Sequence, residues 1–77
     1  MPDAHSLRDM IDRIRALLTV IEEGSVNRAA VRLRITQPAL SRQMQALEND
    51  IGGKLLERGT GGVKPTGLGH ALVKAMR

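Results

Sequence analysis

Thr36-Gln37-Pro38-Ala39-Leu40-Ser41-Arg42-Gln43-Met44-Gln45-Ala46-Leu47-Glu48 is the stretch on which the interpretation of this sequence depends. Read as a helix, it has one apolar stripe with helical spacing, formed by Leu40, Met44, Leu47 and Ile51. The opposite face is polar, has no acidic residue and consists of Pro38, Ser41, Arg42, Gln45 and Asn49. Arginine and side-chain amides pair with base edges in a DNA groove, whereas an ordinary surface helix mixes lysine with glutamate. The stretch alone leaves two interpretations open, a helix that reads bases and a polar surface helix.

The composition indicates one small domain with an aliphatic core. The chain has 77 residues and no cysteine, so neither a disulfide nor a thiolate metal site can supplement the core. The two histidines, His5 and His70, are far apart in the sequence, and we expect no metal site and no cofactor. Because phenylalanine, tyrosine and tryptophan are absent, the chain lacks the stacking platforms of proteins that bind single-stranded nucleic acids.

The sequence shows neither a membrane span nor a secretion signal. No apolar run approaches the ~20 residues that a membrane helix needs, and the start, Met1 to His5, lacks the basic and apolar regions of a signal peptide. We therefore expect a cytoplasmic protein without a membrane partner. No arrangement of Ser/His/Asp, Cys/His or paired carboxylates is visible, so we do not expect an enzyme.

The net charge of +4 is concentrated in the middle of the chain. Seven basic residues lie between Gly24 and Thr66: Arg28, Arg32, Arg34, Arg42, Lys54, Arg58 and Lys64. The same segment has three acidic residues, Glu48, Asp50 and Glu57, so it holds the whole basic excess. A localised excess of this kind is typical of a surface that binds a polyanion.

Apolar residues at helical spacing predict a long amphipathic helix from about Leu7 to Glu22, after a frayed end at Met1 to Ser6. Its expected inner face consists of Leu7, Met10, Ile11, Ile14, Leu17, Leu18 and Ile21. Gly24 can end this helix in the left-handed conformation. Ser25 can then cap the next helix, which we expect from about Val26 to Leu33.

The second and third helices are predicted to form a tight pair. Ala29 and Ala30 lie at the centre of the second helix, and side chains this small allow another helix to cross at close range. After the short link 34–36, Thr36 can cap the third helix, and Pro38 fits its first turn because no N–H is needed there. With its basic outer face, this pair favours a helix-turn-helix that binds DNA.

A small β-hairpin is predicted after glycines that end the third helix. Its expected strands are Lys54–Arg58 and Val63–Pro65, joined by the turn 59–62, and Pro65 ends the pairing because it lacks a donor. The glycines do not form a phosphate-binding loop, because the Lys-Ser/Thr of a Walker motif is absent. Thr66 can cap a last helix, whose apolar side consists of Leu68, Leu72, Ala75 and Met76. An uncovered stripe on a helix of about 10 residues suggests that the helix continues, has a partner, or both.

These features together resemble the N-terminal winged helix-turn-helix of LysR-type bacterial transcriptional regulators. The resemblance begins at about Ile11, and its most specific parts are the paired alanines and the run Gln37-Pro38-x-x-Ser41-Arg42-Gln43. It also includes Gly24–Ala30, Leu33, Ile35–Met44, Leu47-Glu48, Gly52, Leu55–Arg58 and Thr66–Gly69. The implied fold is mainly α, with a three-helix core, a hairpin wing and the start of a linker helix. It divides the chain into a winged helix-turn-helix domain at 1–65 and a linker or dimerisation segment at 66–77.

The resemblance implies sequence-specific binding of double-stranded DNA, with a recognition helix from about Gln37 to Asp50 in the major groove. The positions implied to read bases are Gln37, Pro38, Ala39, Ser41, Arg42 and Gln45. Those implied to contact the DNA backbone are Asn27, Arg28, Thr36, Arg58 and Lys64. A homodimer is implied through Leu68, Leu72, Ala75 and Met76, and we expect it to be weak because this helix is short. The family's effector domain lies outside this sequence, so no small-molecule effector site is expected in it.

The sequence departs from the family pattern in its core and in its wing. The family usually has phenylalanines where this chain has Leu17, Val26 and Leu56. The wing tip, often basic, is Gly61-Gly62 here, which leaves Arg58 and Lys64 as the expected wing contacts. Two alternatives remain open. Molybdate-responsive regulators have a related domain with a glycine-rich wing, and some winged helices bind proteins.

Overall fold

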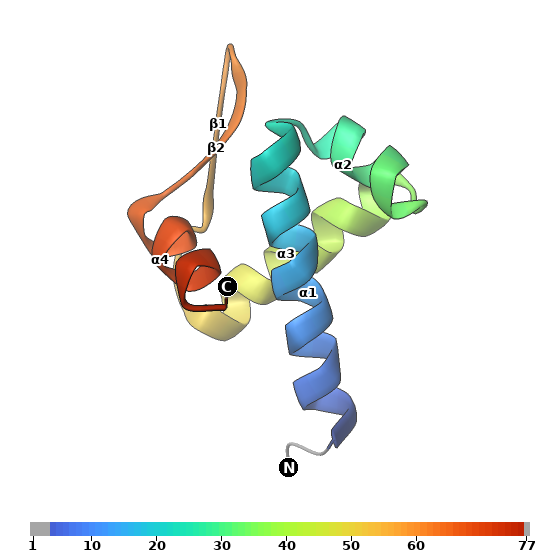
Figure 1. Ribbon diagram of the computed structural model, residues 1–77, viewed down its shortest axis with the longest axis vertical. Coiled ribbons are helices and arrows are strands. Elements are labelled where there is room, and N and C mark those ends of the chain that lie inside the picture. Colours follow the sequence, from blue (N-terminus) through green and yellow to red (C-terminus); the bar gives the residue numbers. More distant parts are fainter. Residues whose placement is uncertain (1–3, 77) are drawn as a thin grey trace.

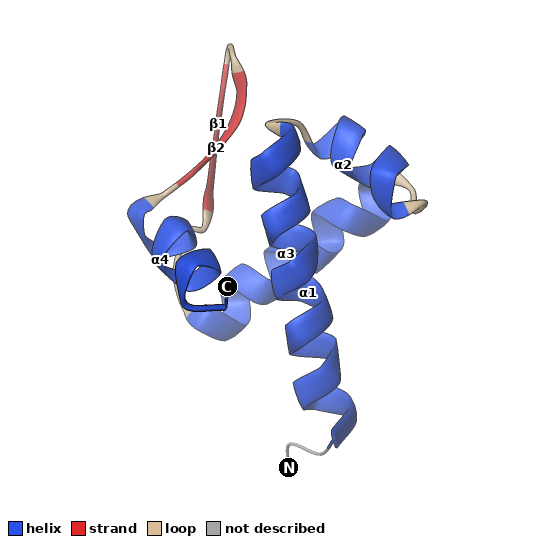
Figure 2. Cartoon of the chain, in the orientation of Figure 1, coloured by secondary structure: helices blue, strands red, loops and turns tan. Residues whose placement is uncertain are grey.

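The computed structural model describes residues 4–76, with side chains from Leu7 to Met76. The fold is mainly helical with one small antiparallel hairpin, as the sequence predicts (Figures 1 and 2). The elements in chain order are α1 (Ala4–Glu23), α2 (Val26–Leu33), α3 (Gln37–Ile51), β1 (Leu56–Gly59), β2 (Gly62–Pro65) and α4 (Gly67–Met76). In this part of the chain no helix combines the length and the apolar character that crossing a bilayer requires.

The other elements pack around α1, which contacts α2, α3, α4 and β2. It begins at Ala4, so the predicted frayed end is wrong for residues 4–6, while residues 1–3 lie outside the described part. The periodic large apolar residues begin only at Leu7, and the smaller residues before it extend the helix without adding to that pattern. Leu7 is 63% exposed, contrary to its predicted place on the inner face, because this end of α1 projects beyond the other helices (Figure 1).

The core lies where α1, α2 and α3 meet. Ala29 is completely buried and Ala30 is 3% exposed, which confirms that small side chains lie in the packed face of α2. The predicted stripe of the third helix is also confirmed, since Leu40, Met44 and Leu47 are buried and Ile51 packs against the core. The buried residues of α1 are Ile14, Ala16, Leu17, Thr19 and Val20. Only two of them, Ile14 and Leu17, belong to the predicted face, whose members Met10, Ile11, Leu18 and Ile21 are half-buried. The buried side of α1 therefore extends beyond the predicted face, because several elements surround this helix.

Local backbone conformations fix both ends of α2. Gly24 has a left-handed φ of +67°, and the Ser25 Oγ accepts a hydrogen bond from the Arg28 N–H at 3.2 Å, which confirms the predicted stop and cap. At the other end, Arg34 is left-handed with a φ of 60°, and the Ile35 N–H donates to the Ala30 carbonyl at 3.0 Å. A residue with a side chain rarely adopts this conformation, so the sequence does not indicate it.

The hairpin is shifted relative to its predicted strands. Leu56 pairs with Pro65 and Gly59 pairs with Gly62, so the turn is shorter than predicted and the pairing ends at Pro65, as expected. β1 begins at Leu56 and not at Lys54. Thr66, which would face Leu55, still donates its N–H to the Leu55 carbonyl at 3.0 Å, but the Leu55 N–H donates to Glu48 instead of completing the pair. The residue that would face Lys54 is Gly67, where α4 begins.

Contacts to backbone carbonyls hold the hairpin in place. The Val63 N–H donates to the Gly24 carbonyl at 3.0 Å. Gly62, with a φ of +111°, lies so close to the same carbonyl that a Cβ atom would overlap it. At the other end of the hairpin, the Thr66 hydroxyl donates to the Lys54 carbonyl at 2.6 Å. The hairpin is therefore attached both near its tip and at its root.

α4 packs against α1 and the hairpin through Gly69 and Val73, which are both buried. The Gly69 N–H donates to the Thr66 Oγ1 at 3.0 Å, which confirms the predicted cap. Val73 is missing from the predicted apolar side of this helix. Of the residues predicted for that side, Leu72 is half-buried, whereas those that remain exposed are Leu68, Ala75 and Met76.

Gly69 is a position where a larger side chain should be harmful, because its Cβ would overlap the Leu55 carbonyl oxygen. Alanine normally stabilises a helix interior by ~1 kcal/mol relative to glycine. Here we expect Gly69→Ala to lower the free energy of unfolding by roughly 1–3 kcal/mol, because α4 must move away from the hairpin. Gly67→Ala is the matched control, since nothing lies within contact distance of its Cβ. Denaturant unfolding of both variants measures the difference, and equal stabilities would contradict this account.

Candidate nucleic-acid interface

α3 presents a capped N-terminal end to the solvent. The Thr36 Oγ1 accepts a hydrogen bond from the Ala39 N–H at 3.3 Å, and Pro38 lies in the first turn, as predicted. The remaining N–H groups of this turn and the helix dipole favour a negatively charged group nearby. The buried stripe of α3 packs against α1 and α2, so its opposite face is turned outward.

The residues predicted to read bases lie along this outward face. Four are exposed, namely Gln37, Pro38, Arg42 and Gln45. The other two, Ala39 and Ser41, are half-buried. Within residues 4–76, Arg42 takes part in no ion pair. Its guanidinium group is therefore available for a ligand. The helix ends at Ile51, one residue beyond its predicted end, where Gly52 adopts the left-handed conformation.

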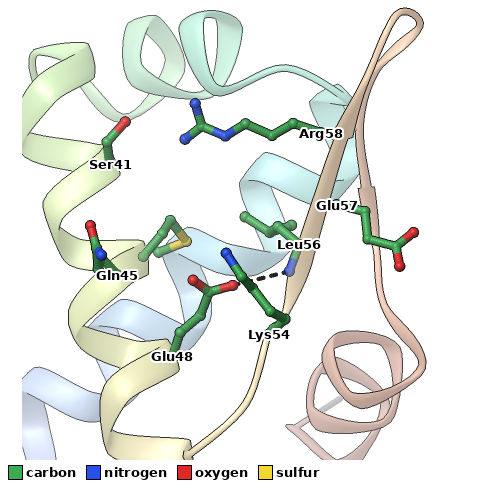
Figure 3. A pocket seen from close by; sticks show the side chains of 8 residues that line it. Ser41, Gln45, Glu48, Lys54, Leu56, Glu57 and Arg58 are labelled. Atoms are coloured by element: carbon green, nitrogen blue, oxygen red, sulfur yellow. Dashed lines mark hydrogen bonds between the residues drawn. The ribbon is translucent and has the colours of Figure 1, made fainter.

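The residues predicted to contact the DNA backbone are all exposed, but the hairpin separates two of them. Arg58 points from β1 toward α3, on the side of Ser41 (Figure 3). In the strand register Lys64 lies directly opposite Glu57, whose side chain points away from α3 (Figure 3). Directly paired residues share one face of a hairpin, so Lys64 lies on the face opposite to Arg58. The others, at the starts of α2 and α3, are Asn27, Arg28 and Thr36.

A hollow of about 660 Å³ separates α3 from β1 (Figure 3). It is lined by Ser41, Met44, Gln45, Glu48, Lys54, Leu56, Glu57 and Arg58. The hydroxyl, amide, ammonium and guanidinium groups among these side chains are hydrogen-bond donors of the kind that contact phosphate oxygens and base edges. The hollow therefore offers polar contacts from a helix on one side and from a strand on the other.

Glu48 has a role at this site that sequence reasoning misses. Its side chain is half-buried, and its Oε2 accepts hydrogen bonds from the N–H groups of Leu55, at 2.8 Å, and Leu56, at 3.3 Å. Figure 3 marks the second of these bonds. The pair Leu47-Glu48 belongs to the family resemblance, but only the structure shows that the carboxylate meets the start of the wing.

Ion pairs reduce the number of cations that are free to meet a ligand. Arg32 contacts both Glu22, at 3.0 Å, and Glu23, at 3.3 Å, and Arg13 contacts Asp50 at 3.2 Å. Exposed pairs of this kind contribute only ~0–1 kcal/mol to stability, but they bring opposite charges together. Six of the seven basic residues in the middle segment take part in no ion pair within residues 4–76: Arg28, Arg34, Arg42, Lys54, Arg58 and Lys64.

A three-helix core with a helix-turn-helix at α2 and α3, followed by a two-stranded hairpin, defines a winged helix-turn-helix domain. The sequence profile of the family described as "Bacterial regulatory helix-turn-helix protein, lysR family" matches residues 11–70. The chain belongs to this LysR family. The match favours the LysR family over the molybdate-responsive regulators, the other family that the sequence alone leaves open.

The relatives are transcriptional regulators. Over 65 residues the chain is 43% identical to the HTH-type transcriptional regulator TcbR of Pseudomonas sp. (strain P51). This match covers 84% of this chain and 22% of TcbR. Over 57 residues it is 51% identical to the HTH-type transcriptional regulator BenM of Acinetobacter baylyi. This match covers 74% of this chain and 19% of BenM. The chain thus spans about a fifth of the length of these relatives.

The fold is similar to solved structures of DNA-binding domains. The crystal structure of the CbnR DNA-binding domain with DNA matches with a TM-score of 0.78 at 42% identity, covering 83% of this chain and 74% of that chain. The BenM DNA-binding domain with catB site 1 DNA matches with a TM-score of 0.79 at 45% identity, covering 83% of this chain and 72% of that one.

The cap of α3 should be measurable without any ligand. We expect Thr36→Val to lower the free energy of unfolding by about 1 kcal/mol, because the Ala39 N–H loses its acceptor while the shape of the side chain is kept. Thr36→Ser keeps the hydroxyl and should remain close to the wild type. Thermal and denaturant unfolding test this. A valine variant as stable as the serine variant would show that the bond contributes nothing.

Proposed function

We propose that this chain is the DNA-binding domain of a LysR-type transcriptional regulator and that it binds double-stranded DNA sequence-specifically through α3. The observation that carries the proposal is the exposed face of α3 from Gln37 to Gln45, which has no acidic residue and stands beside Arg58 of the wing. The solved complexes of the related CbnR and BenM domains with DNA support it. The six basic residues of the middle segment that take part in no ion pair within the described residues also support it.

In this proposal α3 enters the major groove with its N-terminal end first. Arg42 and Gln45 donate hydrogen bonds to base edges, and the rest of the predicted base-reading set contacts neighbouring bases or holds the register: Gln37, Pro38, Ala39 and Ser41. The phosphate backbone is held by Asn27, Arg28, Thr36, Arg58 and Lys64. Because Arg58 faces α3 and Lys64 does not, we assign Arg58 the larger share of the wing's contribution.

We further propose that residues 1–65 form the DNA-binding unit and that residues 66–77 begin a linker helix through which two copies associate. The exposed Leu68, Ala75 and Met76 and the half-buried Leu72 support this, since an apolar helix face usually has a partner. The short helix predicts a weak homodimer. We also propose that the regulator is cytoplasmic and has no catalytic activity, and that these residues contain no effector site.

Selection of bound sequences from a random duplex library tests the proposed function. A recovered motif with two inverted half-sites, separated by about one helical turn or a multiple of it, would support a two-fold dimer on DNA. Affinity that falls steeply with salt would support contacts to phosphates. If the chain bound no duplex even at low salt, the proposal would be wrong, and a winged helix that binds a protein partner would be favoured.

Arg42→Ala should separate base reading from backbone contact. We expect the variant to lose roughly 1–3 kcal/mol of binding free energy on the selected duplex and much less on a random duplex, because a base contact carries sequence information. Arg32→Ala is the matched control, since Arg32 is already paired with Glu22 and Glu23. Fluorescence anisotropy on both duplexes measures the effect. Equal losses on the two duplexes would remove Arg42 from the base-reading set.

The two cations of the wing should differ from each other. Arg58→Ala should weaken binding to selected and random duplexes alike and lower the slope of log K against log salt by about one, as expected for one phosphate contact. Lys64→Ala should have a smaller effect in the same titrations, because Lys64 lies on the other face of the hairpin. A larger effect for Lys64 would show that the wing meets DNA with its outer face.

A further inference from the structure

We propose that Glu48 is a positioning residue for DNA binding: it fixes the wing relative to α3 and so holds Arg58 in place. This inference rests on the proposed function and assigns a role to an acidic side chain that touches no DNA in it. Glu48 lies on α3 between the base-reading positions and the end of the helix. Its carboxylate accepts hydrogen bonds from the backbone at the start of the wing.

The contact is between a charged acceptor and two consecutive backbone donors. The Leu55 and Leu56 N–H groups both donate to the Glu48 Oε2, at 2.8 and 3.3 Å. Leu55 is 1% exposed, so an amide without a partner at this place would be costly. Hydrogen bonds to an ionised carboxylate are stronger than neutral ones. These two bonds therefore fix the position of the start of β1 relative to α3.

The position of Arg58 depends on this contact, because Arg58 comes two residues after Leu56 on the same strand. Its side chain crosses the hollow toward Ser41, while Glu48 lies at the opposite end of the same hollow (Figure 3). The packing of Leu55 and Leu56 against the core also restrains this segment, whereas the other hydrogen bonds of the hairpin do not reach α3. Thr66 joins its root to Lys54, and Val63 joins β2 to Gly24, but neither involves α3.

The sign of the effect distinguishes positioning from charge. A negative charge beside a surface that binds a polyanion lowers affinity, so its removal should strengthen binding if electrostatics alone matters. A positioning role predicts the opposite. Glu57 provides the matched control, since it lies on β1 near the same hollow, is exposed and points away from α3 (Figure 3).

The test compares the full chain with its Glu48→Ala, Glu48→Gln and Glu57→Ala variants on the selected duplex. We expect Glu48→Ala to raise the Kd about tenfold, as when one cation contact is lost, and Glu57→Ala to leave it unchanged or lower it. Glu48→Gln has the same charge as the alanine variant but keeps an acceptor oxygen, so it should recover part of the affinity. An alanine variant at position 48 that binds as tightly as the wild type, or more tightly, would overturn the inference.

Double-mutant cycles separate positioning from a general loss of stability. In the Glu48→Ala background, Arg58→Ala should cost less than it costs in the wild type, because Arg58 no longer reaches its place. Arg42→Ala should cost the same in both backgrounds, since Arg42 lies on α3. Equal penalties for Arg58→Ala in both backgrounds would overturn the inference, and so would a changed penalty for Arg42→Ala, which would indicate a disturbed fold.

Hydrogen exchange tests the contact itself without DNA. The Leu55 and Leu56 amides should exchange faster in the Glu48→Ala variant than in the wild type, while amides in the middle of α1 keep their protection. Unchanged exchange at both amides would show that Glu48 does not hold the wing. If instead the wild type bound no duplex, the proposed function would fall together with the role in DNA binding. The exchange result would still report on the contact alone.

Discussion

The close packing of α2 at Ala29 and Ala30 is the constraint on which the arrangement of the helices depends. A core without aromatic side chains contains no residue bulkier than leucine, isoleucine or methionine, so its helices must lie close together to leave no voids. Both alanines are buried, and α2 contacts α1 as well as α3. A larger side chain at either position would push α2 outward. Because α3 packs against the same two helices, its exposed face would turn with them.

The hairpin depends on the helices for its stability, since a two-stranded hairpin is marginal by itself in water. It is attached to α3 through Glu48, to the turn between α1 and α2 through Gly24, and to the start of α4 through Thr66. In each attachment at least one partner is a backbone group, and none involves a side chain at the tip. The tip can therefore be glycine without loosening the wing.

The sequence predicts the helices, their caps and the helix-turn-helix, because these features follow from periodicity and from short-range hydrogen bonds. Where long-range contacts decide, it predicts less. The start of β1 depends on the register with a strand that already turns into α4, and the exposure of Leu7 depends on how far the other helices extend. Val73 is buried because α1 lies beneath it. The role of Glu48 requires knowledge of where Leu55 lies, which no local pattern contains.

The geometry of the wing indicates where base recognition must reside in the proposed complex. Gly61 and Gly62 offer no side chain at the tip, and the cations of the two strands lie on opposite faces, so one alone is turned toward α3. Phosphate contacts set the register but do not distinguish sequences. Recognition then rests on the exposed face of α3. Since the helix that would read bases also carries the carboxylate that holds the wing, a shift of α3 against Ala29 and Ala30 would move both sets of contacts together.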